Sequence, residues 1–200
     1  LDNVRNVAMG VHKITAEEML TIPTAFGEMD IIKVIQTLPG VKSLGEGTSG
    51  FSVRGGATDQ NLVLFNDNTI YNPNHLFGFF SAINGNIVDN IELYKCNIPS
   101  QYGGRLSSVL DINSKRGNKQ KFTGNASLGV LASSLNLEGP IVKDRTSLLL
   151  SARASYSDWI LGLIPEKSGY KNGRDGFYDP NLVLSHKRTS LDHLHASGYY

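Results

Sequence analysis

Near its centre the chain reads Gly50-Phe51-Ser52-Val53-Arg54-Gly55-Gly56, followed by Asn61-Leu62-Val63-Leu64-Phe65. It continues with Asn90-Ile91-Glu92-Leu93-Tyr94-Lys95 and with Gln101-Tyr102-Gly103-Gly104-Arg105-Leu106-Ser107-Ser108-Val109-Leu110-Asp111-Ile112-Asn113, and the stretch ends at Gly117. Each apolar run is short and ends at Gly, Asn-Asp or Pro, as the strands of a compact sheet do. The stretch therefore predicts a small sheet with glycine turns.

The residues before this stretch add helices to the sheet. Val4–Ile14 reads as an edge strand, and Thr15-Ala16-Glu17-Glu18 has the spacing of a capping box that starts a helix. A second helix is expected from about Glu28 to Leu38, because apolar residues recur there at helical spacing and Pro39 then ends it. Residues 1–117 are thus predicted to form one α+β domain with a small mixed sheet.

From Lys121 the pattern changes to one-sided alternation. Leu148, Leu150, Ala152 and Ala154, for example, alternate with polar residues, and residues 118–200 hold about five such segments. A membrane barrel and a soluble sheet with one wet face both alternate in this way. The links favour the barrel, because a tight one (Pro140–Arg145), a long one (Asp158–Tyr178) and a short one (His186–Leu191) follow in turn.

The order of these segments resembles the plug domain of TonB-dependent outer-membrane receptors. The resemblance covers roughly residues 4–117, and its most specific part is Ile91-Glu92-Leu93-Tyr94-Lys95, a short loop, then Tyr102-Gly103-Gly104-Arg105 and the strand that follows. It implies a plug followed by the first antiparallel strands of an incomplete transmembrane β-barrel. Five strands are fewer than the about eight that close a membrane barrel, so we expect a fragment of a larger receptor.

The resemblance also implies a function, a location and partners. Such receptors sit in the outer membrane and import a siderophore, cobalamin, an oligosaccharide or a peptide, and the plug gates the barrel lumen. The inner-membrane protein TonB supplies the energy by pulling on a segment that we expect before Leu1, so the contact segment is absent from this chain. Outer-membrane lipid would surround the barrel, and a surface lipoprotein caps some relatives. The alternative is a surface binding or adhesion module that does not transport.

The strongest candidate for a ligand surface is the aromatic and polar segment 71–80. Its aromatic and polar side chains would suit a solute with apolar and polar faces, although the phenylalanines would equally suit the core of the domain. The resemblance places the loop after Arg54 on the same outer side. The predicted ligand contacts are Thr58, Asp59, Gln60, Tyr71, Asn74, His75, Phe77, Phe79 and Phe80.

Charged residues form a second group of candidates. In the family, charges on the plug pair with charges on the inner barrel wall, and a buried charge needs such a partner. The resemblance therefore suggests Arg54, Glu92 and Arg105 on the plug. Alternation would turn Glu138 and Arg153 toward the lumen. The alternative for each is a solvated side chain beside a turn.

The remaining motifs point to no catalysis. Gly45-Glu46-Gly47-Thr48-Ser49-Gly50 is a literal G-x-G-x-x-G, but it follows a predicted helix and precedes a strand, the reverse of a dinucleotide site. His193 and His195 could share a metal but have no evident third ligand, and the basic run 115–121 reads as a solvated linker rather than a phosphate site. A net charge of +1 argues against nucleic acid. We therefore expect no enzyme, no cofactor and no resident metal.

Overall fold

The computed structural model describes residues 10–22, 29–43, 50–75, 80–156, 176–188 and 193–199. The chain divides into two compact units. The first, called the N-terminal unit below, comprises Leu1–Pro23 and Asp30–Ser114; the second comprises Thr24–Met29 and Lys115–Tyr200. The domain boundary at Gly117 stays a prediction of the sequence.

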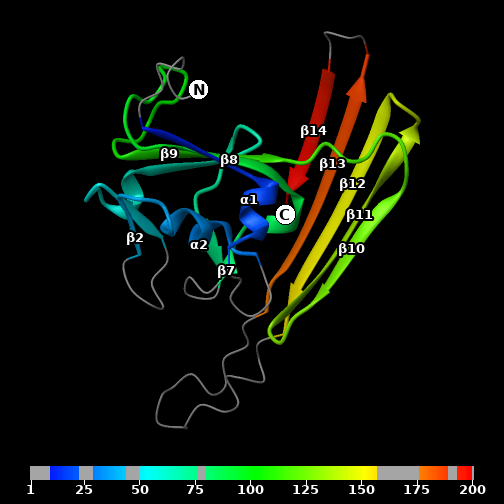
Figure 1. Ribbon diagram of the computed structural model, residues 1–200, viewed down its shortest axis with the longest axis horizontal. Helices are drawn as coiled ribbons and strands as arrows, with labels where there is room; N and C mark the ends of the chain where they lie inside the picture. The colour runs from blue at the N-terminus through cyan, green and yellow to red at the C-terminus, as the bar shows by residue number, and fades with distance from the viewer. Residues whose placement is uncertain are drawn as a thin grey trace. The chain divides into compact units, whose positions relative to one another are not determined.

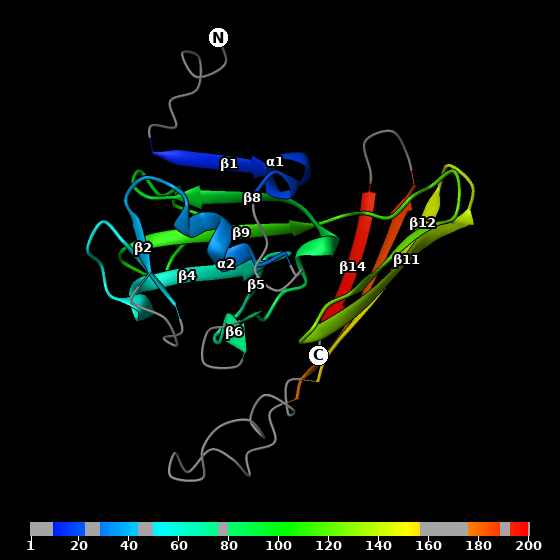
Figure 2. The ribbon, with the colours of Figure 1, turned by 60° about the horizontal axis from the view of Figure 1, so that its bottom comes forward.

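The N-terminal unit is built on a mixed five-stranded sheet (Figures 1 and 2). Its strands lie in the order β1 (Val11–Thr15), β8 (Val88–Tyr94), β9 (Ser108–Ser114), β4 (Asn61–Phe65) and β5 (Asn68–Thr69). Only the β4–β9 pair is parallel; the other pairs in this sheet are antiparallel. The predicted edge strand is therefore confirmed in β1, and residues 4–9 of that prediction lie outside the described ranges.

Two short helices lie on the same side of this sheet (Figure 1). In α1 (Ala16–Leu20), the predicted capping box is confirmed: the Thr15 hydroxyl accepts from the Glu18 N–H, and the Glu18 carboxylate accepts from the Thr15 N–H. The second helix, α2 (Ile31–Gln36), is shorter than expected. It starts at Asp30 because that carboxylate accepts from the Lys33 N–H and caps the first turn.

Small elements complete the unit. Strands β2 (Val41–Ser43) and β3 (Phe51–Val53) pair with each other, as do β6 (Asn74–His75) and β7 (Phe80–Ser81). The 3-10 turns are η2 (Thr58–Gln60) and η4 (Gly85–Ile87). The main core holds Ile31, Ile35, Ile91, Leu93, Leu110 and Ile112, all fully buried. On the other sheet face, Tyr94, Ile98 and Tyr102 cover Leu62, Leu64 and Val109.

The second unit contains an antiparallel sheet in which all five strands pair in chain order, here called the C-terminal sheet (Figure 1). The strands are β10 (Thr123–Leu128), β11 (Ala132–Val142), β12 (Thr146–Ser155), β13 (Tyr178–Lys187) and β14 (His193–Tyr199). About five strands of about ten residues were predicted, and the described ranges contain five. The long link between β12 and β13 lies largely outside them.

Two predicted links were too long. The short link expected over His186–Leu191 begins only after Lys187, where β13 ends. The tight link was expected over Pro140–Arg145, but β11 continues to Val142 and the turn is residues 143–145. Proline removes one ladder donor, and the sheet accommodates it with a register shift between Pro140 and Val142.

Burial in the C-terminal sheet is for most residues the reverse of that in a soluble sheet, although Leu149 and Val183 also lie on the buried face. Along β12, Ser147, Ser151 and Arg153 are buried while Leu150 between them is 43% exposed. The buried polar residues of β11–β13 are Ser134, Asn136, Ser147, Ser151, Arg153, Ser155, Asp179, Asn181 and Ser185. The exposed leucines are Leu135, Leu137, Leu150, Leu182 and Leu184. A wet-faced soluble sheet would bury its leucines, so this arrangement supports the membrane-barrel interpretation.

Candidate functional site

The N-terminal unit carries a hollow of about 140 Å³ on its surface. It brings together four of the predicted site residues from three separate parts of the chain: Thr58 and Asp59 from η2, Tyr71 from the segment after β5, and Arg105 from the loop before β9. Asp59, Tyr71 and Arg105 are exposed. The hollow therefore offers a carboxylate, a guanidinium group and an aromatic ring above a largely apolar floor, which includes Phe51, Leu62, Val63 and Ile70.

Asn61 holds this hollow together from below. Its side chain is buried, and its Nδ2 donates to the Phe51 carbonyl at 2.7 Å and to the Thr58 carbonyl at 3.2 Å. Its Oδ1 accepts from the Ser108 hydroxyl at 2.7 Å. One amide thus joins β3, η2 and β9, so it fixes the position of the 3-10 turn that carries Thr58 and Asp59. No pattern in the sequence marks Asn61, because its partners Phe51 and Ser108 are 10 and 47 positions away.

The residues on both sides of β3 adopt positive φ angles that position η2. Gly50 has φ +112°, and a Cβ there would lie 2.9 Å from the Thr58 Cγ2. Arg54 adopts φ 49°, and Gly55 follows at +84°. Gly50 is the last glycine of the G-x-G-x-x-G look-alike; residues 44–49, which include the rest of that motif, lie outside the described ranges.

The other predicted ligand residues are not gathered at the hollow. Gln60 turns its Oε1 back to the Ala57 N–H at 3.2 Å. Asn74 is buried, with no hydrogen-bond partner for its Nδ2, and His75 is half-buried. Phe80 is 3% exposed and packs in the core, so the packing alternative describes it. Phe77 and Phe79 lie outside the described residues.

Among the plug charges, Glu92 has partners in its own sheet. Its carboxylate accepts from the Lys13 Nζ and from the Tyr94 hydroxyl, both at 2.8 Å. Lys13 and Glu92 are direct cross-strand neighbours on β1 and β8. This local pair was not foreseen, and it reduces the need for a distant partner.

Arg54 lies close to a second cation. Lys95 is 6% exposed and donates from its Nζ to the Pro39 carbonyl at 2.6 Å. Burial lowers the pKa of the Lys95 ammonium, and the positive charge of Arg54 lowers it further. The Arg54 N–H donates to the carbonyl of neighbouring Gly40. Neither cation forms an ion pair with any described residue.

The charges of the C-terminal sheet also find local partners. Arg153 forms a buried ion pair with Asp179, its direct neighbour on β13, and its guanidinium stacks over Phe177 at 5.0 Å from the ring centroid. Glu138 accepts from the Thr123 hydroxyl at 3.0 Å. Asp179 was missed although the predicted long link, Asp158–Tyr178, ends just before it; its alternation with Asn181 on β13 was the available signal.

Residues 3–108 match the family model of the TonB-dependent Receptor Plug Domain, which covers more than half of the chain. The chain belongs to this family. The family consists of receptors and transporters rather than enzymes, and the N-terminal unit is therefore called the plug below.

Relatives support the same assignment. The chain is 28% identical over 128 residues to the ferrienterobactin receptor of Escherichia coli (strain K12), an alignment that covers 55% of this chain and 17% of that receptor. The siderophore receptor PirA of Acinetobacter baumannii superposes with a TM-score of 0.64 at 19% identity, over 96% of this chain and 31% of PirA. The alcaligin receptor FauA of Bordetella pertussis superposes with a TM-score of 0.63 at 19% identity, over 98% and 32%.

These structural likenesses confirm the fold: a plug followed by the antiparallel strands that begin a receptor barrel. The chain spans about a third of each solved receptor. None of the helices in the described ranges is long and apolar enough to cross a bilayer. Nor do the described residues bring three His, Cys, Asp or Glu side chains together as a metal site; the side chain of His193 lies outside them.

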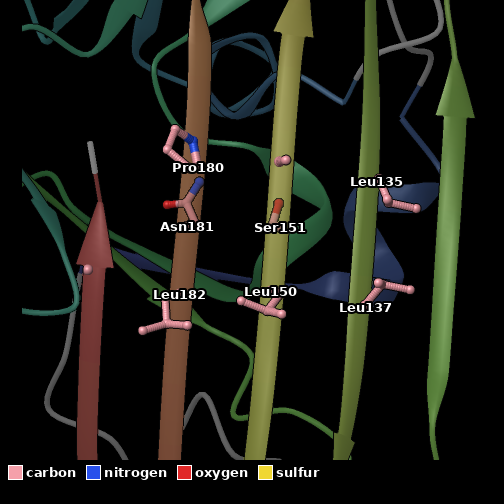
Figure 3. A pocket seen from close by; sticks show the side chains of 9 residues that line it. Leu135, Leu137, Leu150, Ser151, Pro180, Asn181 and Leu182 are labelled. Atoms are coloured by element: carbon pink, nitrogen blue, oxygen red, sulfur yellow. The ribbon is translucent and has the colours of Figure 1, made fainter.

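The face of the C-terminal sheet that carries the exposed leucines is called the leucine face below. A larger hollow, of about 490 Å³, lies on this face. Figure 3 shows Leu135, Leu137, Leu150 and Leu182, which line it from β11, β12 and β13. Pro180 and the small residues Ala152 and Gly198 leave the space between them. This hollow has no charged lining residue, so it suits hydrocarbon rather than a polar nutrient.

Proposed function

We propose that this chain is the plug and the first wall strands of an outer-membrane receptor for energised uptake of a scarce nutrient, and that the nutrient is a siderophore or a similar metal chelate. The observation that carries the proposal is the plug hollow, where Asp59, Tyr71 and Arg105 converge. The named relatives, which include receptors for ferrienterobactin and alcaligin, favour this nutrient class over cobalamin, oligosaccharides and peptides.

The chemistry of the hollow suits part of such a ligand. The Arg105 guanidinium would bind a carboxylate or an anionic oxygen, and the Tyr71 ring, 86% exposed, would stack on a planar group. Ligand pockets for drug-sized molecules measure about 300–1,000 Å³, so a hollow of about 140 Å³ holds one moiety. The rest of the ligand would contact other parts of the receptor.

We propose a gating role for Arg54 and Lys95, two plug cations that form no ion pair with any described residue. A buried ammonium such as that of Lys95 is costly without a counter-charge. We propose that Arg54 and Lys95 meet carboxylates on the inner wall of the complete barrel, and that pulling by TonB breaks these contacts and opens a path. Arg105 and Glu138 remain candidates for the same kind of contact. Glu92 and Arg153 are weaker candidates because their charges are already paired.

The C-terminal sheet supports placement in a membrane. Its leucine face is bordered at one end of the strands by Phe122, which is 81% exposed, and at the other end by Tyr178, which is 75% exposed. Membrane barrels place aromatic girdles at both borders of an apolar band about 25 Å tall. We infer that this face contacts outer-membrane lipid. A surface lipoprotein partner stays a prediction.

Uptake by the complete receptor tests the proposal. Cells that express it would be supplied with radiolabelled iron on catecholate, hydroxamate and carboxylate siderophores, and with cobalamin. We expect uptake of at least one ferric siderophore, a strong decrease in Arg105→Ala and Tyr71→Ala, and no change in Lys42→Ala, an exposed plug control. Binding of ligand without any TonB-dependent uptake would instead support the surface binding module.

A further inference from the structure

Three basic segments meet at one end of the C-terminal sheet: residues 115–121 before β10, the turn 143–145, and residues 187–188 at the end of β13. Backbone hydrogen bonds join them. The Asp144 N–H donates to the Lys119 carbonyl at 2.9 Å, and the Lys187 N–H donates to the Arg145 carbonyl at 2.8 Å. We call these three segments the basic rim.

The basic rim carries an unbalanced charge. It contains eight Lys and Arg residues and one acidic residue, Asp144. Six of the cations are exposed: Arg116, Lys121, Lys143, Arg145, Lys187 and Arg188. None of these six forms an ion pair with any residue in the part of the chain that the structure describes. The sequence showed the first segment as a solvated linker; the fold adds the other two beside it.

An apolar surface borders the basic rim directly. Phe122 follows Lys121 and lies against Gly139, where a side chain would collide with the ring. Ile141 and Val142, just before the turn, are 59% and 49% exposed. Cations beside an exposed aromatic and aliphatic surface match the two parts of a lipid, an anionic headgroup and its acyl chains.

We propose that the basic rim binds the phosphate of a glycerophospholipid whose acyl chains lie along the leucine face. The turn at 143–145 is tight, and tight turns of membrane barrels face the periplasm, where the leaflet consists of glycerophospholipids. The apolar hollow supports the acyl chains. Leu137 and Leu150 lie six and five positions from the turn, about 17–20 Å along the strands at about 3.3 Å per residue. Strands of a membrane barrel tilt by about 45°, so this corresponds to a depth of about 12–14 Å, close to half of an apolar band about 25 Å tall, which is the depth that one leaflet fills.

This inference rests on the proposed membrane location and goes beyond it, because a barrel wall needs apolar contact but no choice of headgroup. The membrane location and the headgroup preference can fail separately. If the receptor stays soluble without detergent and retains no lipid, the membrane placement fails. If it retains neutral and anionic lipid equally, only the basic rim proposal fails.

The test is native mass spectrometry of the complete receptor in detergent with an equimolar mixture of palmitoyl-oleoyl phosphatidylglycerol and palmitoyl-oleoyl phosphatidylcholine. We expect preferential retention of phosphatidylglycerol, a preference that weakens as salt rises. In the double variant Lys143→Gln/Lys187→Gln, the ratio of retained phosphatidylglycerol to phosphatidylcholine should fall about fivefold for each cation removed. Lys143→Arg/Lys187→Arg keeps the charge and should retain the preference, as should Lys42→Gln on the plug.

Three results would overturn the proposal. The first is equal retention of the two lipids by the unmodified receptor. The second is a preference that survives in the double glutamine variant, or that Lys42→Gln removes equally. The third comes from repeating the competition with lipid A in place of phosphatidylcholine: preference for lipid A that depends on Lys143 and Lys187 would assign the basic rim to the outer leaflet.

Discussion

Asp111 on β9 lies directly opposite Glu92 on β8, so that two carboxyl groups face each other across one antiparallel pair of strands. Glu92 is held by Lys13 and Tyr94. Asp111 is 7% exposed and accepts one hydrogen bond, from the Tyr102 hydroxyl at 2.8 Å, while its other oxygen has no partner. Like charges placed opposite each other destabilise a sheet, so the plug is more stable when one of these groups is protonated.

Asp111 should contribute to the pH dependence of plug stability. Burial raises the pKa of its carboxyl, the Tyr102 hydrogen bond partly offsets this, and the charges of Asp67 and Glu92 raise it further. A carboxyl with a raised folded pKa stabilises the fold at low pH and loses that contribution as pH rises above about 4 and through the folded pKa. Asp111→Asn should therefore flatten this part of the stability curve, measured by denaturant titration at several pH values. Asp89→Asn, at an exposed position on β8, should leave it unchanged.

Removing the Tyr102 hydroxyl should destabilise the plug. Tyr102→Phe leaves both oxygens of buried Asp111 without a donor, at a cost of about 1–3 kcal/mol in the free energy of unfolding. The ring contact with Tyr94, 5.2 Å between centroids, would be retained. In the Asp111→Leu background, Tyr102→Phe should lower the free energy of unfolding by much less. Equal costs in the two backgrounds would show that the hydrogen bond contributes nothing.

The buried ion pair should be sensitive to loss of one partner. Arg153→Met leaves Asp179 as a lone buried charge, and Asp179→Leu leaves Arg153 in the same state, so each should destabilise by about 3–5 kcal/mol. The double variant Arg153→Met/Asp179→Leu should cost less than either single change. Thermal unfolding of the complete receptor in detergent measures all three, and additive losses would argue against a coupled pair.

The two glycines of the Tyr102-Gly103-Gly104-Arg105 turn should differ. A sharp turn before the strand would require glycine at both positions, but φ is +87° at Gly104 and outside the left-handed region at Gly103. Gly104→Val should cost about 1–3 kcal/mol and displace Arg105 from the hollow, whereas Gly103→Val should cost little because open space surrounds it. Gly50→Ala should also be costly. Gly45 lies outside the described residues, and we predict that Gly45→Ala changes the free energy of unfolding little. Denaturant titration ranks all four.

Solubility should separate the two units. A chain that ends at Gly117 is expected to be soluble, whereas the 200-residue chain should aggregate or need detergent, because its C-terminal sheet exposes leucines and unpaired strand edges. Sedimentation of both chains at matched concentration without detergent measures the difference. Equal solubility would contradict the membrane-facing role of the leucine face.

Local order in the sequence was enough to determine the elements of this protein. Thr15 and Glu18 are three residues apart, so their capping box is readable from spacing. The strands of the plug follow from short apolar runs between turn residues, and those of the C-terminal sheet follow from alternation that repeats every two residues. The family resemblance rests on the same order of short runs. These signals involve neighbours in the chain, and tertiary contacts reinforced rather than overrode them.

Tertiary structure decided what the residues do together. Alternation is the same whichever face is buried, so only the fold could show that serines are buried and leucines exposed on the C-terminal sheet. Asp59, Tyr71 and Arg105 meet in one hollow, Arg153 pairs with Asp179, and backbone hydrogen bonds join Lys119 to Asp144 and Arg145 to Lys187, although 20 or more positions separate most of these residues. Strand pairing and chain crossing bring such residues together, and no local pattern records which distant strands will pair.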